Sequence, residues 1–175
     1  MSEQMPQSLE GSESQGWDEL ARSATRVERD ASQLDDIRQL LTFEVAGTPY
    51  AVPVERVREI VRIRPITPVP HVPTEVRGVI SLRGEIIEVV DMRRRFNLEP
   101  VEPARSTRIV VVHSENGKVA GMLVDAVNEV YRVREDAIRP GSGSESGAVE
   151  SLCVRGEEFV SLLDLDRILE LNADD

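Results

Sequence analysis

The chain has 175 residues, of which 40% are hydrophobic and only 3% aromatic, so its core must be built from Val, Ile and Leu, which favours strands. The net charge of −11 opposes a broad surface for nucleic acid or anionic membrane, because neutralising phosphates needs the opposite sign. The single cysteine, Cys153, cannot form an internal disulfide, and no apolar run approaches the ~18 residues of a membrane span. The polar N-terminus also lacks the apolar stretch of a signal peptide, so we expect a reduced, cytoplasmic protein that does not insert into a membrane.

Residues 1–38 are expected to form a separate acidic tail. The segment carries nine carboxylates against four arginines, a net charge of −5, and has little apolar surface to bury, which is typical of disordered chains. Apolar side chains from Trp17 to Leu34 fall at helical spacing, so a marginal helix is the alternative. In either case we expect residues 39–175 to be the folded domain.

From Gln39 onward, short apolar runs separated by turn residues predict strands. The predicted strands form two sets of five: 40–45, 50–52, 59–63, 78–82 and 86–90, then 108–112, 119–124, 129–133, 150–154 and 159–163. A proline-rich connector at 99–106 separates the sets, and Asn116-Gly117 predicts a two-residue hairpin turn in the second set. Asp164 is expected to cap a short C-terminal helix at about 164–171.

The two sets are related by an internal duplication. With a shift of 70, residues 47–63 and 117–133 share five identical positions of 17, where ordinary residue frequencies give roughly one. After an indel, residues 83–85 match 155–157. A five-stranded sheet of about 60 residues must curl to bury one face and remove its edges. We therefore expect a mainly β fold of two packed small barrels with short helices, the first unit at about 40–98 and the second at about 107–163.

No residue pattern indicates catalysis. His71 and His113 have no cysteine or second histidine at metal-ligand spacing, and Cys153 has no base beside it in the sequence. Residues 141–147 are rich in glycine and serine but lack the lysine of a phosphate-binding loop, so a flexible loop is favoured. The arginines at 93–95 form a basic patch, either as a charged helix surface or as a contact for an acidic partner. We expect no catalytic residue, no cofactor and no metal.

A proline-rich segment is a candidate binding loop. Residues 65–73 contain four prolines, which hold the chain extended and remove backbone donors. We expect a semi-rigid, exposed loop that presents Ile66 and Val69 to a partner. A structural crossing between strands is an equal alternative.

Residues 77–96 (RGVISLRGEIIEVVDMRRRF) resemble the signature of the CheW family of chemotaxis coupling proteins. Shorter stretches in both halves are also similar to that family, and the resemblance spans about residues 39–171. Ser81 and Glu88 depart from it, since the family usually has Asn and Pro there. The resemblance implies a fold of two five-stranded SH3-like barrels, in agreement with the duplication. It also implies a non-catalytic cytoplasmic scaffold that is recruited to membrane-associated receptor arrays.

The resemblance further implies two partners, the cytoplasmic helical hairpin of a chemoreceptor and the regulatory domain of a CheA-type histidine kinase. The positions that the family links to coupling or partner contact are Val57, Glu59, Ile60, Gly78, Arg83 and Gly84. We expect Glu59 and Arg83 to pair across adjacent strands and to hold the shape of a groove between the barrels. The duplication then predicts a second pair, Glu129 with Arg155. The isolated chain is expected to be a monomer.

Other functions are left open by the sequence. A CheW-like adaptor of a specialised, non-chemotactic array of receptors and kinases is the first alternative, and the acidic tail is its only hint. A small barrel that binds nucleic acid is a more distant one, because the acidic net charge and the lack of a basic aromatic face oppose it. An enzyme is the third.

Overall fold

The computed structural model describes residues 19–24, 26, 36–141 and 147–171. The chain divides into two compact units between Ile37 and Arg38, one residue from the expected boundary. In the first unit, residues 19–24 are helical and exposed. The other residues of the apolar face expected between Trp17 and Leu34 lie outside the described residues.

The second unit is mainly β, and all ten predicted strands are present. The elements in chain order are β1 (Ile37–Val45), β2 (Thr48–Pro53), the 3₁₀ turn η1 (Val54–Arg56), β3 (Val57–Arg62), β4 (Val76–Leu82), β5 (Glu85–Asp91), α2 (Met92–Arg95), β6 (Arg108–His113), β7 (Val119–Val124), β8 (Ala126–Arg134), η2 (Glu135–Ala137), β9 (Ile138–Pro140), β10 (Val149–Arg155), β11 (Glu158–Leu163) and α3 (Leu165–Leu169). The three-residue strand β9 is an addition to the predicted set, since a run that ends in proline is a weak strand signal.

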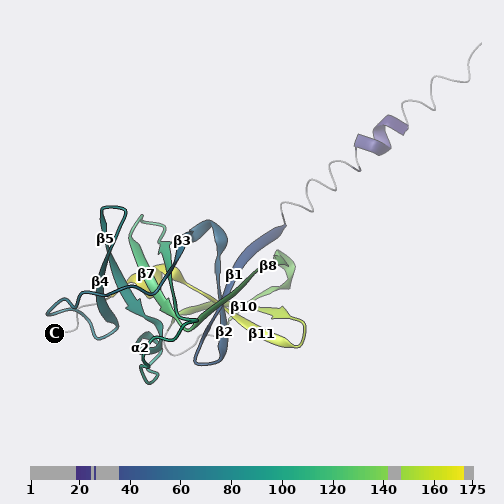
Figure 1. Ribbon diagram of the computed structural model, residues 1–175. Coiled ribbons are helices and arrows are strands. Elements are labelled where there is room, and N and C mark those ends of the chain that lie inside the picture. Colours follow the sequence, from purple (N-terminus) through teal and green to yellow (C-terminus); the bar gives the residue numbers. More distant parts are fainter. Residues whose placement is uncertain (1–18, 25, 27–35, 142–146, 172–175) are drawn as a thin grey trace, which may run out of the picture. The chain divides into compact units, whose positions relative to one another are not determined.

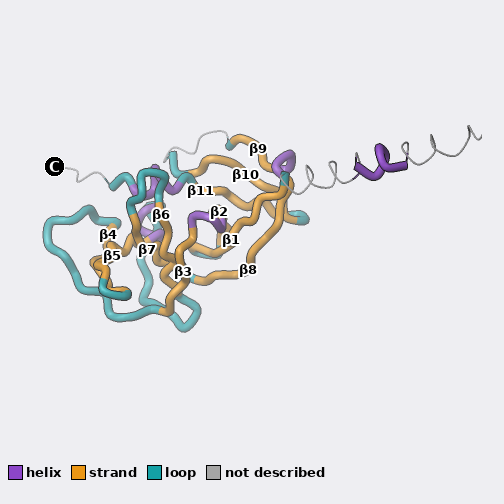
Figure 2. The backbone as a smooth tube through the Cα atoms, turned by 90° about the horizontal axis from the view of Figure 1, so that it is seen from above, coloured by secondary structure: helices purple, strands orange, loops and turns teal. Residues whose placement is uncertain are grey.

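The strands form two sheets that are built by exchange between the halves of the chain (Figures 1 and 2). One sheet has the order β8-β1-β2-β11-β10-β9, and the other has the order β3-β6-β7-β5-β4. Each sheet thus takes its first hairpin from one half and its remaining strands from the other. The expected contiguous units 40–98 and 107–163 are therefore not the two sheets, because local strand patterns do not specify which repeat a hairpin joins.

The duplication is nevertheless preserved in the topology. When β1 to β5 are matched with β6, β7, β8, β10 and β11, the two sheets have the same strand order, apart from the added β9. Each contains one parallel pair, in which Ser161 lies opposite Tyr50 and Glu88 lies opposite Ala120. These are equivalent positions in the two repeats. The exchange therefore preserves the register of each sheet.

Two of the hairpins have two-residue turns of the X-Gly type. Ala46-Gly47 and Arg83-Gly84 both have positive φ at each residue, as a type I′ turn requires. The expected two-residue turn at Asn116-Gly117 is instead part of a five-residue loop, in which the Ser114 amide donates to the Lys118 carbonyl at 2.9 Å. Of these two residues only Gly117 has positive φ, as in longer loops built around a type I turn.

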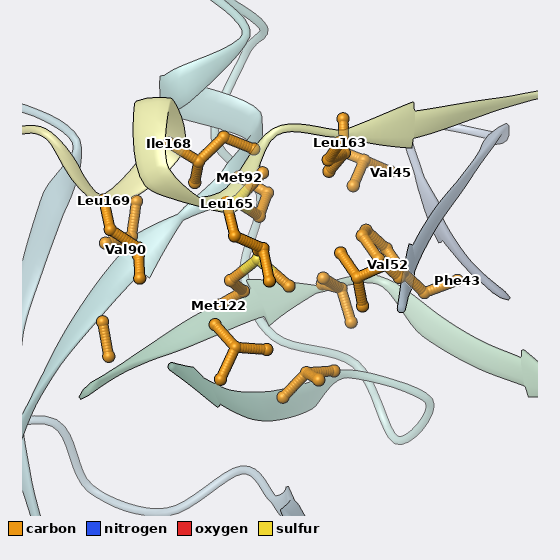
Figure 3. Close-up of a cluster of buried hydrophobic side chains, with 14 of the residues drawn as sticks. Phe43, Val45, Val52, Val90, Met92, Met122, Leu163, Leu165, Ile168 and Leu169 are labelled. Atoms are coloured by element: carbon orange, nitrogen blue, oxygen red, sulfur yellow. The ribbon is translucent and has the colours of Figure 1, made fainter. Parts of the chain in front are cut away.

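The largest hydrophobic cluster joins the two sheets (Figure 3). Phe43 and Val52 come from the six-stranded sheet, and Met122 comes from the five-stranded sheet. The helices α2 and α3 close this shared core with Met92, Leu165, Ile168 and Leu169. Their N-caps, Asp91 and Asp164, are equivalent residues of the two repeats. Two smaller clusters fill the interiors of the two sheets separately.

Replacement of a shared-core residue is expected to destabilise both sheets together. Phe43 is fully buried, so Phe43→Ala should cost about 3 to 5 kcal/mol of unfolding free energy. Phe159→Ala is the matched control, because its ring is 67% exposed and its loss should cost less than about 1 kcal/mol. Urea unfolding followed by circular dichroism measures both. Equal midpoints for the two variants would contradict this assignment of the core.

The acidic tail is expected to be dispensable for folding. All buried hydrophobic residues of the described chain lie between Leu40 and Leu169. A chain beginning at Asp36 should therefore melt within about 2 °C of the full-length protein, since less than about 0.5 kcal/mol is at stake. A much lower melting temperature of the shortened chain would show that the tail contributes to the core.

Candidate partner-binding surface

Strand β3 presents three of the predicted site residues at one edge of the five-stranded sheet. Its neighbour on one side is β6, where Glu59 lies opposite Val111 and Ile60 opposite Val110. Val57 is half-buried and packs against the shared core, so it supports the surface from beneath. Ile60 is 43% exposed, although it stands in the middle of a strand. An apolar side chain in that position is available to a partner.

Glu59 and Arg83 form the predicted ion pair. Arg83 Nε lies 3.2 Å from Glu59 Oε1, and Nη2 lies 3.3 Å from Oε2. The strands are not adjacent, however, since β3 and β4 are the two ends of the sheet order. A second pair, Arg58 with Glu85 at 2.7 Å, and the hydrogen bond from Arg64 to the Ser81 carbonyl also join the β3 side to the β4–β5 hairpin. The pair therefore closes the sheet into a barrel, which corrects the expectation of a contact across adjacent strands.

The Arg83 side chain contributes little to stability. It is 75% exposed, whereas Glu59 is 21% exposed, so water and salt screen the pair. Exposed ion pairs of this kind contribute about 0 to 1 kcal/mol. Arg83 should therefore tolerate substitution without loss of the fold.

The predicted second pair is confirmed in the other sheet. Arg155 Nη1 lies 3.0 Å from Glu129 Oε1 and joins β10 to the edge strand β8. The two arginines do not occupy the same register, because Arg155 is the last residue of β10 and faces Glu158, whereas Arg83 lies in its turn. The two equivalent ion pairs are therefore made by arginines that lie one position apart in the repeat.

Gly78 is required by internal packing. It has φ +145°, and a Cβ at this position would overlap the carbonyl oxygen of Thr67. The close approach allows Thr67 and Val79 to exchange two backbone hydrogen bonds of 2.9 Å. This bridge holds the proline-rich segment against β4. Gly78 is buried, so its role in this structure is to seat that segment.

The proline-rich segment is less exposed than expected. Ile66 is half-buried and packs against the interior cluster of the five-stranded sheet, and Val69 is also half-buried. The segment is thus a structural crossing between β3 and β4 that leaves Ile66 and Val69 only partly exposed, whereas Thr67, Pro68 and Pro70 are exposed. Gly84 differs from Gly78, because it is exposed in its turn and a Cβ added there would meet no atom within 4 Å.

Substitutions at the two glycines should separate packing from turn geometry. Gly78→Ala forces the backbone of Thr67 away and is expected to cost about 2 to 4 kcal/mol of unfolding free energy. Gly84→Asn places a residue that tolerates positive φ in open space and should cost less than about 1 kcal/mol. Urea midpoints of the two variants test this difference. A Gly78→Ala protein as stable as the native one would refute the packing role.

Sequence reasoning missed the most exposed apolar residues. Ile86 on β5 is 70% exposed, next to the turn that carries Arg83. In the other sheet, Phe159 is the equivalent of Ile86, and the exposed Val130 is the equivalent of Ile60. The signal was present, because two consecutive apolar residues such as Ile86-Ile87 cannot both face the interior of a barrel. Each sheet therefore displays apolar residues at matching outer positions.

A partly buried polar contact fixes one crossing between the sheets. Arg93 on α2 binds both carboxylate oxygens of Asp125, with Nη2 at 2.7 Å, and Asp125 lies between β7 and β8. The Ala46 amide also donates to Asp125 at 2.7 Å. Burial opposes ionisation of Asp125, but the hydrogen bonds from Arg93 and Ala46 outweigh it and hold its pKa below its usual range. Of the arginines at 93–95, Arg93 is thus paired within the fold.

The lowered pKa of Asp125 predicts a pH-dependent contribution to stability. A group with a depressed folded-state pKa stabilises the protein above its unfolded-state pKa, and this stabilisation is lost as the pH falls through the folded value. Asp125→Asn should therefore lower the unfolding free energy by about 1 to 3 kcal/mol at pH 7. The difference from the native protein should shrink below about pH 4. A difference that is constant with pH would contradict the ionic role of Asp125.

The described residues offer no arrangement for metal chemistry, since they contain no group of three or more His, Cys, Asp or Glu side chains that could hold an ion. Cys153 is buried, and burial raises the pKa of its thiol. His113 is occupied by contact of Nε2 with the Glu55 carbonyl at 3.0 Å. Within the same part of the chain, no helix has the length and apolar character needed to cross a bilayer.

This two-sheet fold is similar to that of a scaffolding protein of known crystal structure. The crystal structure of the scaffolding protein TtCheW from Thermoanaerobacter tengcongensis superposes with a TM-score of 0.73 and 29% identity, covering 78% of this chain and 95% of that one. The chemotaxis protein CheW of Rhizobium meliloti is 33% identical over 136 residues, which cover 75% of this chain and 86% of that protein. Protein FrzA of Myxococcus xanthus is 28% identical over 145 residues, or 80% and 90% of the two chains.

The family model described as a CheW-like domain matches residues 39–173. The chain therefore belongs to the CheW-like domain family, as residues 77–96 indicated.

Proposed function

We propose that this protein is a non-catalytic cytoplasmic scaffold that couples chemoreceptors to a CheA-type histidine kinase. Family membership over residues 39–173 and the likeness to a scaffolding protein support a binding role. The observation that carries the proposal is the group of Ile60, Arg83 and Ile86 where the five-stranded sheet closes, in which two exposed apolar residues accompany an exposed arginine that is paired with Glu59. Such a surface suits protein contact and offers no group arranged for catalysis.

The kinase regulatory domain is assigned to this surface. Its apolar strand residues would pack on Ile60 and Ile86, while Arg83, in its turn with Gly84, sets the rim. The helical hairpin of the receptor is assigned to the seam between the two sheets, where a helix can lay an apolar face. Through the receptor, the scaffold would be recruited to membrane-associated arrays, with residues 39–175 as the coupling domain and the acidic tail as a modulator of partner choice.

A specialised array is the second candidate function. The match to FrzA, whose name is not that of a chemotaxis CheW protein, favours an adaptor that serves a different set of receptors and kinases. Recovery of partners from native lysate with residues 39–175 as bait identifies the receptor and the kinase that the protein serves. Capture of a histidine kinase with a coiled-coil receptor supports both, and the output controlled by that kinase decides between them.

Reversal of one charge should weaken binding far more than folding. Arg83→Glu places two carboxylates together, so affinity for a CheA regulatory domain should fall at least tenfold, about 1.4 kcal/mol. The unfolding free energy measured with urea should change by less than about 1 kcal/mol, because Arg83 is exposed. Titration calorimetry with the kinase domain and with a receptor-tip fragment measures the first quantity.

The charge-swapped variant and a matched control make this test specific. Glu59→Arg combined with Arg83→Glu restores an ion pair and should recover part of the lost affinity. Arg155→Glu reverses the equivalent arginine of the other sheet and should leave the kinase contact near its native strength. Native affinity in the Arg83→Glu protein would refute the assignment of the surface.

A further inference from the structure

Two arginines face each other across the edge of the five-stranded sheet. Arg62, the last residue of β3, lies directly opposite Arg108, the first residue of β6. Directly opposed residues of an antiparallel pair point to the same face, so like charges there repel each other. Arg105 lies in the loop that precedes β6, and its side chain is exposed. The sheet thus carries an unfavourable cluster of positive charge at one end.

No carboxylate of the described residues forms an ion pair with these three arginines. The ion pairs found there include Arg58 and Arg83 of the same sheet, but none includes Arg62, Arg105 or Arg108. Acidic side chains are not scarce, since removal of the tail's −5 from the total of −11 leaves −6 for residues 39–175. A repulsive cluster left unpaired in an acidic domain indicates a ligand of opposite charge.

The cluster is also preorganised. Arg108 Nη1 donates to the carbonyls of Arg105 and Thr107, at 2.8 Å each. These two bonds hold one side of the guanidinium in place and leave its other donors free. A fixed planar guanidinium loses less entropy on binding a carboxylate than a mobile side chain does.

We propose that Arg62, Arg105 and Arg108 form a docking site for a short acidic segment of a partner protein. Ile60 stands two residues before Arg62 on the same face of β3, so the site is continuous with an exposed apolar side chain. A protein segment that carries carboxylates beside apolar groups fits this combination. An extended nucleic acid fits it poorly, because the folded domain as a whole carries a net charge of −6. The proposal rests on the positive charge of these three arginines and does not depend on the coupling function proposed above.

Binding of a short fluorescent oligoglutamate peptide, followed by anisotropy at low salt, tests the site. Arg62→Gln and Arg108→Gln are each expected to weaken binding about threefold to tenfold, and an ionic strength of about 0.5 M should weaken binding to the native protein. Arg132→Gln is the matched control, because Arg132 is the exposed equivalent of Arg62 in the other sheet. Unchanged binding in both variants, or an equal loss in the control, overturns the proposal. A DNA duplex that binds more tightly than the peptide, or phosphate that displaces it at millimolar concentration, does so as well.

Stability gives an independent readout. Because Arg62→Gln relieves repulsion, its urea midpoint at low salt should equal or exceed that of the native protein. The peptide should raise the midpoint of the native protein and not that of the variant. A lower midpoint for Arg62→Gln would show a structural role for this arginine and would overturn the proposal.

Discussion

The exchange of hairpins between the two repeats is the constraint on which the rest of the structure depends. The chain passes from one sheet to the other after β2 and returns after β7, so neither repeat can complete a sheet alone. A unit of this size would bury too little surface to be stable by itself. The exchange solves this problem, because the cluster around Phe43 and Met122 draws on both sheets and is capped by both helices. Asp125, held by Arg93, fixes the second crossing.

The exchange also determines where partners can bind. It leaves β3 and β8 as edge strands, which are closed by Glu59 with Arg83 and by Glu129 with Arg155. Side-chain ion pairs hold the two edges of each sheet together more weakly than backbone strand pairing would. Apolar residues remain exposed beside these ion pairs. The binding surfaces thus arise where the barrels are closed. The two surfaces are not identical, because the register of the five-stranded sheet places Arg62 and Arg108 opposite each other there.

Local features of the structure could be predicted from the sequence, and relations between distant strands could not. Strand positions follow from hydrophobic runs, and the repeat predicted the Glu129 and Arg155 pair. Sheet membership could not be predicted, because equivalent hairpins carry the same pattern and fit either sheet equally well. The partial burial of Ile66 depends on Gly78, whose missing side chain leaves room for the crossing segment at 65–73. The exposure of Ile86 follows from strand alternation, since Ile87 beside it faces the interior.

Native-state hydrogen exchange tests the central claim most directly. The amides of β4 and β5 belong to one sheet, and those of β10 and β11 belong to the other. If the exchanged hairpins and the shared core make the domain one cooperative unit, the most protected amides of both hairpins should exchange with the same free energy of opening, equal to that of global unfolding. Opening free energies that differ between the two hairpins by more than about 1 kcal/mol would show that the sheets unfold separately, and would contradict this account.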